Sequence, residues 1–528
     1  TDAIDNSAGV DCSDHEVNIK ILLSDVVTAG DLTGKQRDRL LAEMTDRVAD
    51  LVLLDNYQQT QALTLAESDG AQALDGQNRL MRQLEHGPLN LHRRLEGLPN
   101  DEEIADRRST ATGLTRPELA ILLSYAKMAL YDDLLATDLP DDAALSDDLI
   151  RYFPEKLWQK FPAAIPRHRL RREIIASSVT NSMINSVGAL FVNDVQQQTG
   201  GSAAEIARAY VIARDVFDVD RLWAAVDALD NKVISSIQTA MLLKIRTMVA
   251  SGTIWFLRHA PHPLDIAALR TAYRDGIAEI ANGLELYLSE DENSALQNSI
   301  QGLQQAGVPA TLARSIAATD FLAHAGDIVR VAGLQNRDVG SVATVYFDLG
   351  QRFSITWLRQ QTAGLDADSH WQRMAIDALI NELFNHQIKL TEQVLASLPA
   401  TPAGAKAARK KANVTAVKAV TIWAEDRQAA IARSHLNWPG SSGPIRPTAP
   451  SSPSPPPARA STPRSWSSPA TTPPTPSCAS RSAAPAGSSP SSSTTATPTA
   501  ARAASPARSA AAAVTPAAAL AAGSRCSG

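Results

Sequence analysis

The residues whose types and spacing could support chemistry gather near the start of the chain. Asp11, Asp14, His15 and Glu16 bring three carboxyl groups and one imidazole into six consecutive positions, directly before an apolar stretch at residues 17–27. Oxygen and nitrogen donors of this kind bind divalent cations in proteins. Adjacent side chains on a helix point in different directions, however, and charged residues often gather at helix ends. We therefore expect no metal site here and interpret the cluster as helix-terminal.

Nucleotide-binding loops are the next candidates, because a phosphate-binding loop would define the chemistry. No Gly-x-Gly-x-x-Gly motif follows a predicted strand in the sequence. Residues 30–36, Gly-Asp-Leu-Thr-Gly-Lys-Gln, have too few residues between the glycines for a P-loop, and Gln36 stands where a magnesium-binding hydroxyl belongs. This stretch is better interpreted as the loop and cap that precede a helix.

The remaining charged and nucleophilic residues favour structural roles. The basic run at residues 167–172 leads into Glu173 and an apolar pair, which is typical of one solvated or subunit-facing side of a helix, and residues 409–411 are interpreted in the same way. His259 and His262 flank a proline in a predicted turn and lack the helical spacing of paired metal ligands. No Ser-His-Asp or Cys-His arrangement can be assigned from order and spacing. The three cysteines, Cys12, Cys478 and Cys526, form neither a disulfide framework nor a zinc motif.

Length, charge and hydropathy narrow the class of protein. The chain has 528 residues, enough for two to four domains. Residues 440–528 contain seven arginines and no lysine, aspartate or glutamate, which leaves 43 basic against 56 acidic residues in the rest of the chain. An acidic body disfavours a nucleic-acid partner. No uninterrupted stretch of about 18 apolar residues and no leader pattern occurs, so we expect a cytoplasmic protein without a membrane partner.

Helix signals dominate the body of the chain, with little indication of strands. Three capping boxes predict helix starts, at Thr33 with Gln36, at Thr115 with Glu118, and at Ser202 with Glu205. The expected fold is mainly α, a helical bundle or layered helices. Further helices are predicted over residues 234–257, 264–288, 311–324, 339–361 and 371–398. Five tryptophans at helical spacing from aliphatic residues are expected in the core: Trp158, Trp223, Trp255, Trp357 and Trp371.

The composition changes near Trp438, beyond which Pro, Ser, Ala, Thr and Arg prevail. Such a segment lacks the apolar mass to form a core, so residues 437–528 are predicted to be a disordered tail. Two interpretations remain for its origin. It is either a proline-rich ligand for aromatic grooves or the product of an out-of-frame reading of a gene rich in G and C. We favour the second, because the preceding helical pattern stops without a cap.

Several segments resemble the C-terminal third of the large bacterial NAD-specific glutamate dehydrogenases, and together they cover about residues 1–433. They are residues 6–20 (NSAGVDCSDHEVNIK), 32–37 (LTGKQR), 55–59 (DNYQQ), 113–120 (GLTRPELA), 125–131 (YAKMALY), 169–175 (RLRREII) and 209–215 (AYVIARD). The resemblance implies oxidative deamination of L-glutamate by NAD and water to 2-oxoglutarate, ammonium and NADH. It also implies a homo-oligomeric full-length enzyme, whose catalytic lysine, proton-shuttling carboxylate and Rossmann domain would lie upstream of residue 1.

One family motif carries over residue by residue. Smaller hexameric glutamate dehydrogenases have an Asn-Ala-Gly-Gly-Val-x-x-Ser string, and residues 6–13 of this chain are similar to it, with the small residues at Ser7 and Ala8 shifted. The resemblance implies that Asn6 approaches the nicotinamide ribose, that Gly9 lets the backbone pass close by, and that Ser13 donates a hydrogen bond to the distal carboxylate of glutamate. A tight turn leading into a helix is the structural alternative for all three.

Two functional hypotheses follow. The first is that residues 1–31 form the end of a catalytic cofactor domain and residues 32–436 a helical C-terminal domain of a glutamate dehydrogenase, inactive alone and with no catalytic residue of its own. The second is that the helical body is a regulatory or oligomerisation module without chemistry. The two are compatible.

Overall fold

The computed structural model describes residues 2–323, 325–365, 370–397 and 420–421, so the predicted tail at residues 437–528 lies outside the described residues. All regular elements in this part of the chain are helices, which confirms the predicted mainly α fold. Their bounds are α1 Asp2–Thr28, α2 Gly34–Ser68, η1 Gly70–Ala73, α3 Leu74–His86, α4 Arg93–Glu96, α5 Asp101–Ser109, α6 Arg116–Leu135, η2 Leu139–Asp141, η3 Ala143–Leu145, α7 Ser146–Tyr152, α8 Glu155–Lys160, η4 Ile165–Arg167, α9 Arg171–Val187, α10 Phe191–Thr199, α11 Ala203–Val216, α12 Val219–Asp227, α13 Ser235–His259, α14 Ile266–Tyr287, α15 Glu290–Gln305, α16 Ala310–Leu322, α17 Ala325–Leu334, α18 Val339–Arg352, α19 Ile355–Ala363 and α20 His370–Ala396.

The three predicted capping boxes are confirmed. At the start of α2, the backbone N–H of Thr33 donates to Gln36 Oε1 at 2.9 Å, and the Gln36 N–H donates back to Thr33 Oγ1 at 3.4 Å. Reciprocal caps also begin α6 at Thr115 and α11 at Ser202. Each cap satisfies backbone donors that the first turn of a helix leaves without intrahelical partners.

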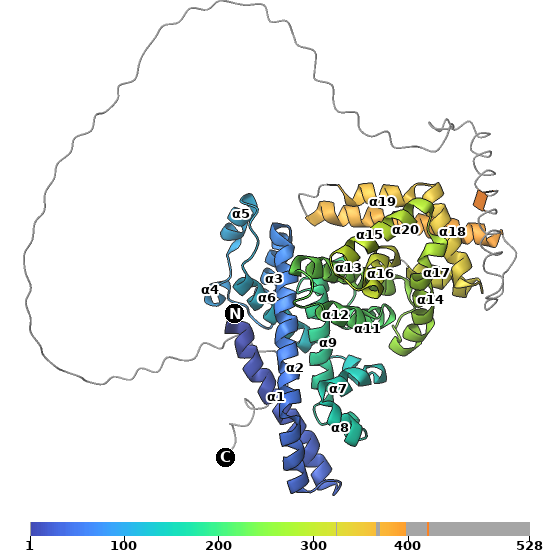
Figure 1. The fold of residues 1–528 in the computed structure, drawn as a ribbon. Helices are drawn as coiled ribbons and strands as arrows, with labels where there is room; N and C mark the ends of the chain where they lie inside the picture. The colour runs from blue at the N-terminus through green and yellow to red at the C-terminus, as the bar shows by residue number, and fades with distance from the viewer. Residues whose placement is uncertain (1, 324, 366–369, 398–419, 422–528) are drawn as a thin grey trace, which may run out of the picture. The chain divides into compact units, whose positions relative to one another are not determined.

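Helices α1 and α2 pack against each other as an antiparallel pair (Figure 1). The loop between them turns at Gly30, whose φ of +86° suits glycine, and ends at the Thr33 cap. Residues 30–36 are therefore the loop and cap that the sequence predicted. Helix α6 packs on α1, α2 and α9, and α2 also contacts α9 and α13 directly, so these contacts join the α1–α2 pair to the rest of the helical body.

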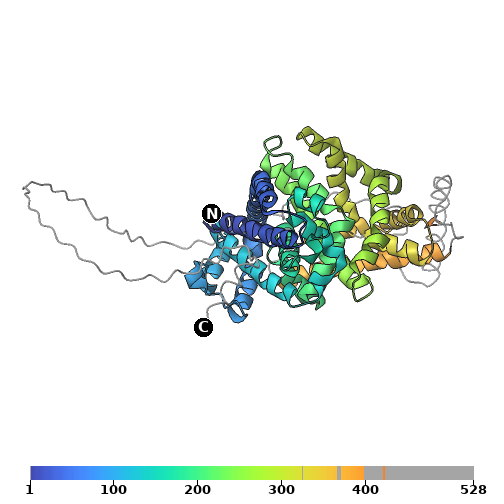
Figure 2. The ribbon, with the colours of Figure 1, turned by 90° about the horizontal axis from the view of Figure 1, so that it is seen from below.

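The centre of the body is the contact between α11 and α13, around the fully buried Tyr210. Helix α13 also contacts α12 and α16. Figure 2 shows the whole ribbon turned by 90° about the horizontal axis. A Cβ built on Gly252 of α13 would lie 2.4 Å from the Phe217 ring, so the glycine permits the close approach. By length and composition, α13 is long and apolar enough to cross a membrane, and so is the bent pair α9 and α10 taken together. However, 56% of the most apolar segment of α13 is buried inside the protein, as in a core helix.

Two predictions about the body are wrong in part. The helix predicted over residues 339–361 is divided into α18 and α19, because Ser354 adopts a left-handed conformation with φ of +55°. Among the tryptophans, Trp223 and Trp255 lie in the core as predicted, whereas Trp158 and Trp357 are 37% and 46% exposed. Helical spacing did not indicate this exposure. Trp158 lies on α8 and Trp357 on α19, and both helices are short and lie at the surface. The Trp371 side chain lies outside the described part.

Candidate functional site

Helix α1 carries all the site residues that the sequence singled out. It runs without interruption from Asp2 to Thr28, so Asn6, Gly9 and Ser13 lie within a helix and not in a turn before one. Residues separated by three or four positions share one face of a helix. On this face the Gly9 position opens into free space, since no described atom lies within 4 Å of a built Cβ. Ser13 is exposed, and its hydroxyl donates to the carbonyl of Val10 at 2.7 Å. The Asn6 side chain lies outside the described residues.

The opposite face of α1 is buried and polar. The buried residues between positions 9 and 18 are Asp11, Asp14, His15 and Asn18, each at most 5% exposed. Their spacing of three and four residues places them in one stripe along the helix. The interpretation of the cluster as helix-terminal is therefore wrong, because its members lie in the middle of α1. Asp11, Asp14 and His15 face the protein, and Glu16 is exposed.

Residues of α7 and the segment after η4 contact this stripe directly. Asn18 Nδ2 donates to the Tyr152 hydroxyl at 2.8 Å, and the ring of His15 stacks on the ring of Tyr152. His168 Nε2 lies 3.1 Å from the carbonyl oxygen of Asn18. His168 is buried, and the loss of hydration lowers its pKa. Aromatic packing and hydrogen bonds thus fix the middle of α1 against α7.

A lysine from α6 completes the cluster. Lys127 is 4% exposed, and its Nζ has no hydrogen-bond partner among the described residues. Burial lowers the pKa of Lys127 to about 8, against the opposing influence of the carboxyl groups of Asp55 on α2 and Asp11 on α1. Burial likewise raises the pKa of Asp55 to about 7, and Asp11 raises it further. A cation and two carboxyl groups from three helices therefore act on one another in a region largely screened from water.

Two further members of α1 have strongly shifted pKa values. Burial, and then the neighbouring Asp11 carboxyl, raise the pKa of Asp14 to about 7. Burial lowers the pKa of His15 to about 4, so its imidazole is neutral at physiological pH. The pKa of Tyr152 is raised, mainly by burial. Groups that titrate near neutrality can take up and release protons under working conditions. Within the described residues, no three or more His, Cys, Asp or Glu side chains are arranged to hold a metal ion.

Buried polar atoms without hydrogen-bond partners are concentrated in this region. Within the described part of the chain they include Asp14 Oδ2, His15 Nδ1, Asn18 Oδ1 and Lys127 Nζ. Such atoms are rare in folded proteins and mark functional or strained positions. Five residues of the cluster were not predicted as site residues from the sequence: Asn18, Asp55, Lys127, Tyr152 and His168. A usable signal was present for Lys127, which is the lone charge within the apolar run of residues 119–131.

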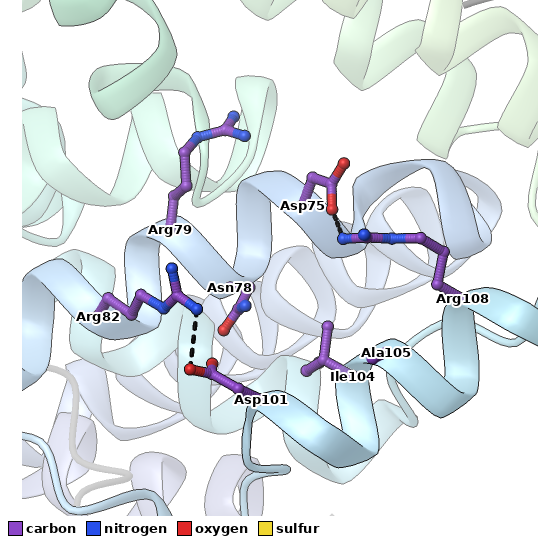
Figure 3. A pocket seen from close by; sticks show the side chains of 8 residues that line it. All are labelled: Asp75, Asn78, Arg79, Arg82, Asp101, Ile104, Ala105 and Arg108. Atoms are coloured by element: carbon purple, nitrogen blue, oxygen red, sulfur yellow. Dashed lines mark hydrogen bonds and ion pairs between the residues drawn. The ribbon is translucent and has the colours of Figure 1, made fainter. Parts of the chain in front are cut away.

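Two of the cavities in the described part of the chain lie outside the cluster, and neither was predicted. The first, about 280 Å³, lies between α3 and α5 (Figure 3). Its arginines are neutralised in place: Arg82 pairs with Asp101 at 2.8 Å and Arg108 pairs with Asp75, while Arg79 points away from these pairs. The second cavity, about 360 Å³, is lined by arginines and aspartates of α7, α11, α12 and α14. At its base the guanidinium of Arg214 binds both oxygens of Asp148, at 2.8 and 3.1 Å.

The other predicted charged sites have structural roles. The basic run at residues 167–172 lies across the bend between η4 and the start of α9, so it is not one side of a single helix. Within it, Arg169 pairs with Asp25, and Arg171 and Arg172 pair with Asp141. His259 ends α13, and His262 Nε2 lies 2.9 Å from the carbonyl oxygen of Leu257, consistent with a loop role. Residues 409–411 lie outside the described residues.

Comparison with protein-family models places the chain among the glutamate dehydrogenases. Residues 111–436 match the model described as "Glutamate dehydrogenase, C-terminal", and residues 1–66 match "Bacterial NAD-glutamate dehydrogenase, catalytic domain". Helix α1 and nearly all of α2 thus belong to a segment that resembles the catalytic domain, whereas α6 and the helices that follow belong to the C-terminal match. The buried cluster joins the two segments.

Individual relatives give the same assignment. The NAD-specific glutamate dehydrogenases of Halomonas elongata and Pseudomonas aeruginosa are each 42% identical to this chain, over 400 and 396 residues, and that of Mycobacterium tuberculosis is 32% identical over 398 residues. Each match covers 75% of this chain and 24% of the relative. The chain belongs to the NAD-specific glutamate dehydrogenase family, as the sequence motifs indicated, and spans about a quarter of the length of these relatives.

Proposed function

We propose that this chain serves the oxidation of L-glutamate to 2-oxoglutarate and ammonium with NAD as the hydride acceptor, as the C-terminal part of a longer enzyme. The observation that carries the proposal is the open face of α1 around Gly9 and Ser13, within the segment matched by the catalytic-domain model. Polypeptide upstream of residue 1 would supply the catalytic lysine and most of the NAD contacts. The full enzyme is proposed to be a cytoplasmic homo-oligomer.

Within this proposal the face of α1 contributes to binding and not to the chemical step. Ser13 donates a hydrogen bond to the distal carboxylate of glutamate, Asn6 approaches the nicotinamide ribose, and Gly9 lets the backbone pass near the cofactor. The division into residues 1–31 and residues 32–436 is part of the same proposal. No catalytic residue is assigned to this chain.

The helical body is a candidate for a second role, as a regulatory or oligomerisation module. Its support is the pair of polar cavities, in both of which arginine and aspartate side chains are prominent in the lining. This role is compatible with the first, because a body that carries no chemistry of its own can still bind an effector or another subunit.

The activity is tested in a chimera. Residues 1–436 replace the matching C-terminal part of the P. aeruginosa enzyme, and NADH formation is followed with glutamate and NAD. We expect turnover by the chimera and none by the isolated chain. Turnover by the isolated chain would contradict the assignment of the catalytic groups to upstream polypeptide. A chimera that assembles like its parent and yet forms no NADH would contradict the proposed function.

The binding face is tested in the same chimera with Ser13→Ala. Loss of a hydrogen bond to a carboxylate costs about 1.5–3 kcal/mol, so we expect KM for glutamate to rise about tenfold or more. The matched control is Ser24→Ala, because Ser24 is also an exposed serine of α1 whose hydroxyl donates to a backbone carbonyl, that of Lys20, at 2.7 Å. An unchanged KM in Ser13→Ala would remove Ser13 from the site.

A further inference from the structure

The two halves of α1 are held against the body by different kinds of residues. From position 19 onward the buried residues of α1 are apolar: Ile19, Leu22, Leu23 and Val26. Between positions 9 and 18 they are all polar or ionisable. Apolar packing therefore fixes the second half of the helix, whereas the placement of the first half depends on the charges and hydrogen bonds of the buried stripe.

Lys127 is the one cation among the ionisable groups that face this stripe in the described structure. The groups are Asp11, Asp14 and His15 of α1, Asp55 of α2, Tyr131 of α6, Tyr152 of α7, and His168. With His15 neutral, the Lys127 ammonium is a positive charge that acts on the Asp55 and Asp11 carboxyl groups, which come together when α1 docks. Three like charges in a region of low dielectric repel one another strongly unless a cation or protons neutralise them.

We propose that Lys127 is a positioning residue, whose ammonium balances Asp11 and Asp55 and so holds residues 9–18 of α1, and with them the Ser13 face, against the helical body. The part of this inference that gives the Ser13 face a role in substrate binding rests on the proposed function. The docking of α1 by Lys127 does not depend on it. It assigns the α6 helix of the C-terminal segment a part in shaping the binding face of the catalytic segment. Lys127 touches neither substrate nor cofactor in this role.

Charge sets the conditions under which the docking holds. Near neutral pH the lysine is cationic and Asp14 and Asp55 are partly protonated, so the lysine offsets much of the negative charge of the cluster. Raising the pH ionises Asp14 and Asp55 first and then neutralises the lysine, which leaves uncompensated negative charge. We expect the first half of α1 to loosen above about pH 8, while the second half does not respond.

The test compares hydrogen–deuterium exchange in the wild-type chain and in Lys127→Met, expressed as protection factors. At about pH 8 we expect residues 9–18 to lose at least tenfold in protection in the variant, while residues 19–28 of the same helix keep theirs. At about pH 6, where Asp14 and Asp55 are largely protonated, the difference is expected to shrink. The double variant Lys127→Met/Asp55→Asn, which removes one negative charge as well, is expected to regain much of the lost protection.

Two controls separate positioning from general stability. Arg330→Met removes a partly buried cation of α17 that pairs with Asp327 and has its own buried Nε without a hydrogen-bond partner. It is expected to leave the ratio between the two halves of α1 unchanged. The proposal would be overturned if Lys127→Met lost no protection, lost it equally in both halves of α1, or lost it to the same extent at both pH values. Failure of the Ser13→Ala test with the exchange result intact would refute the proposed binding face and leave the docking role standing.

Discussion

The ring of Tyr152 lies 4.4 Å from the imidazole of His15, centroid to centroid, with an angle of 19° between the ring planes. The same tyrosine accepts a hydrogen bond from Asn18 at 2.8 Å, so one residue of α7 holds two successive turns of α1. The stacked imidazole is nearly enclosed, which disfavours its charged form.

Substitution of His15 by leucine is expected to change how stability depends on pH. The pKa of His15 is lowered from 6.5 to about 4, so the unfolded chain binds a proton that the native chain does not between these values. As the pH falls from about 6.5 to 4, the free energy of unfolding of the wild-type protein should therefore decrease relative to that of His15→Leu, by up to about 3 kcal/mol. Urea unfolding of both proteins at several pH values checks this. A difference that stays constant with pH would contradict the buried neutral imidazole.

Asp55 and Lys127 are expected to shift each other's pKa in opposite directions when one is removed. Because the Lys127 charge lowers the pKa of Asp55, Lys127→Met should raise it further above about 7. Because the Asp55 carboxylate raises the pKa of Lys127, Asp55→Asn should lower it further below about 8. Carbon-13 NMR titration of the carboxyl and lysine Cε signals measures both values. Unchanged values in both variants would show that the two groups do not interact.

Arg214→Met is expected to destabilise the protein strongly. Arg214 and Asp148 are both at most 5% exposed and form a bidentate pair, so the variant leaves a buried carboxylate without its main partner. Loss of one member of such a pair costs about 3–5 kcal/mol. The double variant Arg214→Met/Asp148→Leu, which removes both charges, should recover part of this loss. Denaturant unfolding gives the free energies, and a single variant as stable as wild type would contradict the expectation.

Gly252→Ala is expected to destabilise the centre of the body. The added Cβ would lie 2.4 Å from the Phe217 ring, and overpacking of this kind costs about 1–3 kcal/mol. The matched control is Gly302→Ala in α15, where no described atom lies within 4 Å of the new Cβ. There alanine should stabilise by about 0.5–1 kcal/mol through its higher helix propensity. Thermal unfolding of the two variants should therefore shift in opposite directions.

The sequence was most informative where structure is decided locally. The Thr33, Thr115 and Ser202 caps depend on a side chain and a backbone group three residues apart, and all three were predicted correctly. The break at Ser354 was not predicted, because a left-handed serine leaves no mark in the apolar pattern on either side of it. Periodicity indicates which face of a helix is apolar, but not whether the chain continues through every turn.

The buried cluster was not predicted, because Asp11, Asp14 and His15 are polar and were interpreted as a helix end. Charged side chains are rarely buried unless they interact with each other. The spacing of Asp11, Asp14, His15 and Asn18 is that of one buried helix face, and Val17 is exposed. The pattern of a buried face was therefore present in the sequence, but with polar residues buried and an apolar residue exposed. Their partners on α2, α6 and α7 come from distant parts of the chain, and only the fold brings them together.

The two-part docking of α1 has a consequence for temperature. Hydrocarbon packing, which holds the helix from Ile19 onward, weakens on cooling because its driving force near room temperature is largely entropic. Confinement of Lys127, Asp11 and Asp55 away from water also becomes more costly in the cold, since the hydration of ions grows more favourable. Both anchors of this one helix thus lose strength in the same direction, and α1 is expected to be the cold-sensitive element of the fold.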